Sequence, residues 1–134
     1  MNAGINPIAA LTRLRNGYLA TMPILSAAMT ALTAEAAAVA RTEGFDISDR
    51  EAGDLAVKVA RRTRDNRASM LQDVEKGRRT EIDYLNGYVA EQGRRLGVKT
   101  PFNDAVVQAV HRHGVGTLRP DPENLEPLVK MLPG

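Results

Sequence analysis

The chain has 134 residues, and its 18 Lys or Arg against 16 Asp or Glu give a formal net charge of +2. This length fits one domain with a substantial hydrophobic core, and so small a charge does not argue for nucleic-acid binding. Cysteine is absent, which excludes disulfides and thiolate metal sites. No apolar run approaches the roughly 20 residues of a membrane span, and the N-terminus lacks the basic segment of a secretory signal. We therefore expect a soluble cytoplasmic protein.

The composition favours helices over sheets. Apolar residues make up 43% of the chain but aromatic residues only 4%, and alanine-rich composition is typical of close-packed helices. No internal repeat and no convincing strand pattern is present. The sequence predicts a single all-α domain over residues 1–134, a bundle of about six helices with a proline-rich tail over 114–134.

Three asparagines mark the first segment, residues 1–17. Asn2 and Asn6 are four residues apart and share one face of a helix, Pro7 interrupts the segment, and Asn16 with Gly17 marks a turn. Asparagine is a mediocre helix former. These side chains therefore serve either as caps and turn residues or in a binding site.

Two helices are predicted next. One covers residues 20–43, with Pro23 in its first turn and Gly44 just past its end. A capping box of Ser48 and Glu51 opens the other, over about 49–65. The residues expected to face the core are Ile24, Leu25, Met29, Leu32, Ala36, Leu55, Ala56 and Val59.

The stretch 66–87 carries the strongest local signals. Ser69 with Gln72 three residues later forms a capping-box pattern, and Thr80 is a second N-cap that puts Glu81 at the first position of a helix. Gly87 inside that helix suggests close packing. The core face expected for it consists of Ile82, Leu85, Val89 and Leu96.

The remaining segment continues the helical pattern. Gly97 ends the Glu81 helix, Thr100 and Pro101 start another, and Asp121 caps a short helix near 122–131. The core side of the helix after Pro101 is expected to hold Phe102, Val106, Val107 and Val110.

Other motifs do not add up to a catalytic site. His111 and His113 point about 200° apart on a helix and cannot share a metal. Gly114-Val115-Gly116 lacks the third glycine and the strand of a dinucleotide loop.

The arginine clusters fit solvated helix faces, with a phosphate-bearing partner as the alternative. The carboxylates of Asp73, Glu75, Glu81 and Asp83 are no denser than on an ordinary surface, so we expect no metal site.

A family resemblance changes the weight of these residues. Ser-Met-Leu-Gln-Asp at 69–73 and Gly-Arg-Arg-Thr-Glu-Ile-Asp-Tyr-Leu-Asn-Gly at 77–87 resemble the signature of the C-terminal domain of ketopantoate reductase (2-dehydropantoate 2-reductase). The resemblance runs from about Asn2 to the helix after Pro101 and includes Thr-Pro-Phe-Asn at 100–103. It implies an all-α fold like that of 6-phosphogluconate dehydrogenase-like proteins.

The resemblance also implies roles for single residues. The family reduces 2-dehydropantoate to pantoate with NADPH, in pantothenate biosynthesis. By resemblance, Asn2, Asn6, Asn16, Asn66 and Ser69 bind the 2-keto or 2-hydroxy acid. Glu81 matches the residue that lies where the nicotinamide ribose and the substrate meet.

Other parts of the family pattern do not occur in this sequence. The family's general-acid lysine lies four residues before the position of Asn2 and would therefore precede Met1. The strand–Gly-x-Gly-x-x-Gly–helix unit that holds the nucleotide is not found either. We therefore expect the substrate-binding and dimerisation half of a reductase, with no catalytic residue and no tight NADPH binding by itself.

Two further expectations follow. A homodimer would cover apolar surface expected over residues 1–32, and a separate nucleotide-binding domain is a second candidate partner; nucleic acid and membranes are not expected. The alternative function is a stand-alone helical module for self-association or for binding a small carboxylate.

Overall fold

The computed structural model describes residues 2–113 and 119–132, and this part of the chain is helical without a strand. The all-α prediction is confirmed, with more helices than the six expected because predicted segments are divided by turns. The helices are α1 (Asn2–Thr12), α2 (Asn16–Thr21), α3 (Pro23–Thr42), α4 (Asp49–Arg62), α5 (Ser69–Glu75), α6 (Asn86–Leu96), α7 (Pro101–His113), the 3-10 helix η1 (Pro122–Leu125) and α8 (Glu126–Val129).

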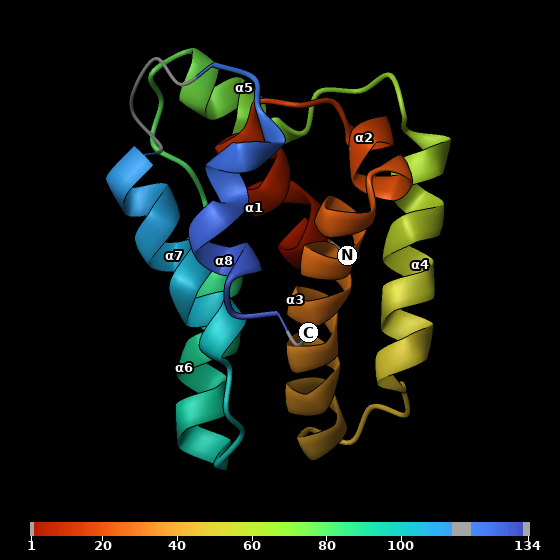
Figure 1. Cartoon of the computed structure of the whole chain (residues 1–134). Helices are drawn as coiled ribbons and strands as arrows, with labels where there is room; N and C mark the ends of the chain where they lie inside the picture. The colour runs from red at the N-terminus through yellow and green to blue at the C-terminus, as the bar shows by residue number, and fades with distance from the viewer. Residues whose placement is uncertain (1, 114–118, 133–134) are drawn as a thin grey trace.

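Helix α1 is the centre of the fold. Its residues from Gly4 to Thr12 are all buried, and it contacts α2, α3, α4, α5, α7 and η1. Figure 1 shows it between α3 on one side and α7 on the other, with α5 near one end. A helix that is apolar all round is expected in such a position. The predicted interruption at Pro7 is wrong, since the helix continues through this residue.

Helices α3 and α4 form the adjoining antiparallel pair. The predicted capping box at the start of α4 is confirmed: Glu51 N donates to Ser48 Oγ over 3.0 Å, and Ser48 N donates to a Glu51 carboxylate oxygen over 3.3 Å. The helix ends at Arg62 rather than 65. Leu55 is 41% exposed whereas Ala56 is fully buried, so the inward face is narrower than predicted.

The predicted helix over 20–43 is divided at Met22, whose backbone is extended between α2 and α3. Asn16 and Gly17 begin α2 instead of forming a turn. Leu25, Met29 and Leu32 are buried as predicted, but Ile24 is 51% exposed. The helix axis changes direction before Pro23, and this turns Ile24 toward solvent.

Helix α3 is long and apolar enough to cross a membrane by length and composition, which corrects the expectation that no segment reaches that length. The core helix of a soluble protein passes the same test. Leu25, Met29 and Leu32 of α3 lie in the hydrophobic core, and the helix packs on α1 and α4. We therefore assign α3 to the core; the cytoplasmic location stays a prediction.

The helix predicted to start at Glu81 starts five residues later, at Asn86. Residues 81–85 form a turn in which the Tyr84 and Leu85 amides donate to Glu81 O over 2.9 and 3.0 Å. The predicted Ser69 cap is also wrong: Ala68 precedes α5 without a side-chain cap, and Gln72 Nε2 donates to Arg67 O. Tertiary contacts override such local signals; here Ile82, Ala68 and Asn86 are all buried.

The packing of α6 differs from the prediction in detail. Its buried positions are Asn86, Ala90 and Gly93, and Leu96 is exposed. Gly97 ends the helix in the left-handed conformation, with φ 73°, as predicted. Close packing occurs at Gly93, where an added Cβ would lie 2.7 Å from Val98 O and Thr100 Cγ2, and not at Gly87.

The later elements follow the predictions more closely. Helix α7 begins at Pro101 and buries Val106 and Val110, with His111 and His113 exposed at its end. The Asp121 side chain accepts from Glu123 N over 2.8 Å at the start of η1, which confirms the predicted cap. Gly114-Val115-Gly116 lies outside the described residues.

The apolar surface predicted over residues 1–32 is largely buried. Its large hydrophobic side chains pack in the core, and the exposed ones among the described residues of this range are Tyr18 and Ile24. The surface argument for a dimer is therefore wrong for most of this segment.

The two glycines of α6 give a matched test of packing. Gly93→Ala forces a methyl group against a backbone carbonyl and should lower the free energy of unfolding by about 1–3 kcal/mol. Gly87→Ala places its Cβ 3.4 Å from Ile82 O, an ordinary contact, and should be neutral or stabilise by up to about 1 kcal/mol. Urea unfolding of both variants measures the difference, and equal effects would contradict the packing described here.

Candidate functional site

Two of the predicted substrate residues, Asn16 and Asn66, meet where α2 begins, and a third, Ser69, begins the nearby helix α5. Asn16 N donates to Asn66 O over 3.1 Å, and Asn16 Nδ2 donates to Thr63 Oγ1 over 2.9 Å. Ser69, the first residue of α5, is exposed three residues after the exposed Asn66. The fold therefore joins residues that lie far apart in the sequence into one polar surface.

The amide oxygen of Asn16 is one of two buried side-chain oxygens without a hydrogen-bond partner among the described residues; the other is that of Asn86. Asn16 is a buried residue, and its Oδ1 has no hydrogen-bond partner among the described residues. A buried acceptor without a partner costs about 1–3 kcal/mol and calls for an explanation such as a water or a ligand.

Asn2 and Glu81 belong to a second group, at the other end of α1. Asn2 lines a shallow hollow with Ala3, Tyr84, Leu85, Tyr88 and Val89, and Glu81 lies exposed in the turn that leads to Tyr84. Tyr84 is 77% exposed, so an aromatic ring stands open beside Asn2. This side of the molecule offers apolar contact and polar groups together.

By resemblance, the family's general-acid lysine would precede Met1. Met1, which that lysine would precede, lies outside the described residues. The described structure therefore does not test the expectation that this chain carries no catalytic residue, and it stays a prediction.

Asn6 lies between the two groups, one turn after Asn2 on α1, and is only 7% exposed. Because α1 contacts both α2 and α5, the helix that carries Asn2 and Asn6 also supports the Asn16 group. The predicted residues therefore lie in two groups at opposite ends of α1, with the buried Asn6 between them.

A buried polar chain fixes the first turn of α1, and it was not predicted from the sequence. Asn86 Nδ2 donates to Ala3 O over 2.7 Å and to Asn103 Oδ1 over 2.8 Å. Asn103 Nδ2 donates in turn to Glu35 Oε1 over 2.7 Å. Asn86 and Asn103 are fully buried, and this chain connects α1, α6, α7 and α3.

Glu35 also caps α7 from the side. Its carboxylate accepts from the backbone amides of Phe102 and Asn103, each over 2.9 Å. These are orphan donors of the first helical turn, and a carboxylate at a helix N-terminus is electrostatically favourable. The start of α7 predicted from Thr100 and Pro101 is confirmed, but the partner that satisfies these two amides comes from α3.

The C-terminal end of α1 is held by Arg13. Its backbone lies in the left-handed region with φ 61°, and its guanidinium donates to Ala10 O and to His113 O. Burial lowers the pKa of Arg13, with the Glu75 carboxylate acting in the opposite direction. The side chain ties the ends of α1 and α7 together.

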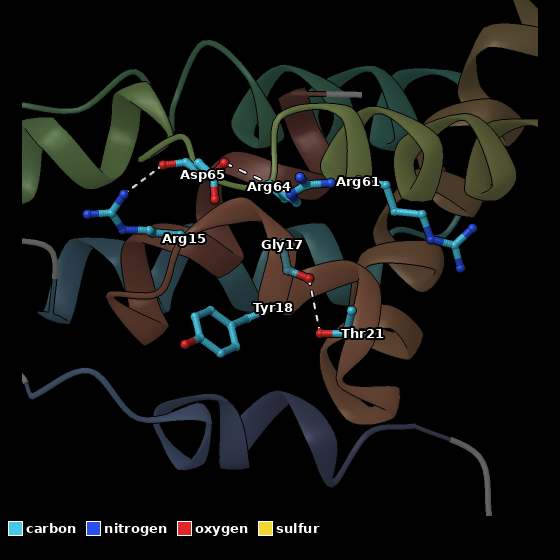
Figure 2. A pocket seen from close by; sticks show the side chains of 7 residues that line it. All are labelled: Arg15, Gly17, Tyr18, Thr21, Arg61, Arg64 and Asp65. Carbon is cyan, nitrogen blue, oxygen red and sulfur yellow. Dashed lines mark hydrogen bonds and ion pairs between the residues drawn. The ribbon is translucent and has the colours of Figure 1, made fainter.

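A basic hollow of about 530 Å³ lies next to the Asn16 group, between α2 and the end of α4. Figure 2 shows Arg15 on the side of Tyr18, with Arg64 above Gly17 and Arg61 further along, and Arg15 donates to Asp65 O over 2.8 Å. The guanidinium groups of Arg15 and Arg61 point to opposite sides in this view. They do not converge on one anion, which fits the prediction of solvated helix faces.

Metal ligands do not gather in the described part of the chain, which contains no group of three His, Cys, Asp or Glu residues able to hold an ion. His111 Nε2 lies 2.7 Å from Asp83 Oδ1 in an exposed pair. This contact fixes the turn around Glu81 to α7.

The sequence matches the family described as the ketopantoate reductase PanE/ApbA C terminal over residues 1–114. The chain therefore belongs to this family and corresponds to its all-α C-terminal domain. The resemblance on which the site residues were chosen is thereby confirmed.

The relatives show the same relation. The chain is 36% identical over 110 residues to 2-dehydropantoate 2-reductase of Archaeoglobus fulgidus, a match that covers 82% of this chain and 36% of that protein. A ternary structure of D-mandelate dehydrogenase with NADH and anilino(oxo)acetate shares the fold with a TM-score of 0.78 and 26% identity, over 84% of this chain and 37% of that one. Dimeric ketopantoate reductase from Staphylococcus aureus shares the fold alone, with a TM-score of 0.74, 23% identity and coverage of 84% and 39%. The chain thus spans less than two fifths of the length of each of these proteins.

Removing the Glu35 carboxylate tests how much the buried hydrogen-bond network stabilises the fold. Glu35→Ala leaves the amides of Phe102 and Asn103 without their acceptor and should lower the free energy of unfolding by about 2–4 kcal/mol. Glu51→Ala, which removes an exposed capping carboxylate, should cost about 0.5–1 kcal/mol. Urea unfolding compares them; a Glu35 effect no larger than that of Glu51 would contradict the role assigned to Glu35.

Proposed function

We propose that this chain forms the substrate-binding half of a ketopantoate reductase and works together with a nucleotide-binding domain. The observation that carries the proposal is the junction of Asn16 with Asn66, three residues from Ser69, with a buried amide oxygen that lacks a partner among the described residues. The proposed ligand is 2-dehydropantoate or its product pantoate.

The chemistry of these groups suits a small hydroxylated acid. The Asn66 amide and the Ser69 hydroxyl can donate to a carboxylate, and the Asn16 Oδ1 can accept from a hydroxyl. Their exposure at the surface makes Asn66 and Ser69 accessible. A site of this kind binds through a few placed polar groups beside apolar walls, and the ring of Tyr18, which lines the hollow next to the Asn16 group, offers such a wall.

The described residues fit the nicotinamide cofactor only in part. Glu81 is exposed in a turn and could accept from a ribose hydroxyl, but the described chain has no strand followed by a glycine-rich turn to hold the phosphates. When bound, NADPH would supply the hydride that reduces the keto acid. We propose that the nucleotide-binding domain contributes its cradle and the general-acid lysine, while this chain orients the acid.

The reaction itself gives the primary test. NADPH oxidation with ketopantoate should stay at background for the chain alone and rise when a separately expressed nucleotide-binding domain of a relative is added. Turnover by the chain alone would contradict the proposed division of labour, and so would absence of turnover in every mixture when the domains are shown to associate.

Ligand contact is testable on the chain without its partner. Adding pantoate should shift the side-chain amide signals of Asn16 and Asn66 in a ¹H–¹⁵N spectrum, and Asn66→Ala should weaken the binding about 10–150-fold, equivalent to one hydrogen bond to a charged group. Gln108→Ala, which removes an exposed amide on α7, is the control and should leave the titration unchanged. Equal effects of the two variants would contradict a site at Asn66.

Self-association is the second candidate function. Phe45, Leu55 and Ile24 are exposed apolar side chains of the α3–α4 pair, and a second copy of the chain would cover them. We propose a homodimer, which light scattering at low micromolar concentration should show. A monomer across that range would remove the self-association function and leave the substrate-binding function unaffected.

A further inference from the structure

Pro7 creates a hydrogen-bonding problem in the middle of the fold. In an α-helix the carbonyl of residue i accepts from the amide of residue i+4, so the natural donor for Ala3 O is residue 7. Proline has no N–H. Pro7 lies inside α1, and Ala3 O, on a half-buried residue, is therefore left without its helical donor.

Asn86 supplies the missing donor. Its Nδ2 reaches Ala3 O over 2.7 Å from the start of α6, 83 residues away in sequence. The Asn86 side chain is completely buried, and its amide donors would cost about 1–3 kcal/mol if they were left without acceptors. The bond is therefore a replacement for the one that Pro7 removes.

The orientation of Asn86 is imposed by its neighbours. Asn103 Nδ2 donates to Glu35 Oε1 and to Leu32 O, which directs Asn103 Oδ1 toward Asn86. Both partners of Asn86, Asn103 Oδ1 and Ala3 O, are thus acceptors. Turning the Asn86 amide over would set its oxygen against two acceptors. The Glu35 carboxylate therefore fixes the donor-to-acceptor direction of every hydrogen bond in this network.

This arrangement acts on the proposed site. Ala3 lies between Asn2 and the buried part of α1, and Asn6 follows in the next turn. The same bond holds α1 against the turn that carries Glu81 and Tyr84, because Asn86 directly follows that turn. The geometry between Asn2 and Glu81 therefore depends on Asn86.

We propose that Asn86, oriented by Asn103 and Glu35, is a positioning residue that holds the first turn of α1, and with it Asn2 and Asn6, in place for the hydroxy acid. The part of this inference that concerns the acid rests on the proposed function. The part that concerns the hydrogen bond from Asn86 Nδ2 to Ala3 O does not depend on the proposed function.

A double-mutant cycle between Asn86 and Pro7 tests the inference. Asn86→Leu keeps a side chain of similar size but removes both donors, and should speed hydrogen exchange at the Asn6 and Ile8 amides about tenfold or more. Pro7→Ala restores an N–H that can reach Ala3 O. The double variant should therefore recover most of the lost protection, and the new amide at position 7 should itself be protected.

Asn124→Leu is the matched control. Asn124 Nδ2 donates to Leu11 O over 3.0 Å near the opposite end of the same helix. The hydrogen-exchange protection that Asn124→Leu removes should not be restored by Pro7→Ala, because the effects of distant sites are additive. Pro7→Ala that rescues both asparagine variants equally would overturn the inference, since general stabilisation of the helix would then explain the result. A double Pro7→Ala, Asn86→Leu variant that fails to fold would overturn it as well.

Pantoate titration separates this inference from the proposed function. Asn86→Leu should weaken pantoate binding about tenfold, and Pro7→Ala should restore it. If the wild-type chain shows no pantoate shifts at Asn16 or Asn66, the proposed function fails, while a coupled exchange cycle would still establish the Asn86–Ala3 bond. Wild-type binding without any coupling between Pro7 and Asn86 would overturn the positioning role alone.

Discussion

The fold depends on the need to satisfy the backbone of a helix from which water is excluded. Helix α1 is buried along most of its length, so carbonyls at its ends cannot turn to solvent and must find donors within the protein. Asn86 reaches Ala3 O, Arg13 reaches Ala10 O, and Asn124 reaches Leu11 O. The Asp121 amide donates to Thr12 O over 2.9 Å. Segments far apart in the chain are thereby fixed around one central helix.

The same constraint gives the proposed binding surface a rigid support at the rim of this helix. Asn2 and Asn6 lie on α1, Asn16 follows shortly after it, and Asn66 is joined to Asn16 through the backbone. A rigid support is what small-acid recognition needs, because a few polar groups must hold fixed positions. The polar chain from Glu35 to Ala3 supplies that rigidity without lying at the surface itself.

The sequence predicts the helices well where a local signal and the tertiary structure agree. Ser48 with Glu51, Asp121 and Gly97 mark helix ends that the structure confirms. The prediction fails where burial overrides capping, as at Thr80 and Glu81, because Ile82 and Asn86 are drawn into the core. Asn2, Asn6, Asn16, Asn66, Ser69 and Glu81 were chosen by resemblance. No local sequence pattern predicts the roles of Asn86, Asn103 and Glu35. The one signal is a proline inside a buried helix, which indicates that a distant donor must replace the missing N–H.

Native-state hydrogen exchange across α1 is the most direct test of this account. If α1 is held at both ends by the remote donors described, its amides from Ile8 to Thr12 should exchange only through global unfolding, as slowly as the slowest amides of α3. Exchange of these α1 amides through a local opening of much lower free energy, with α3 still protected, would contradict the central role of the helix.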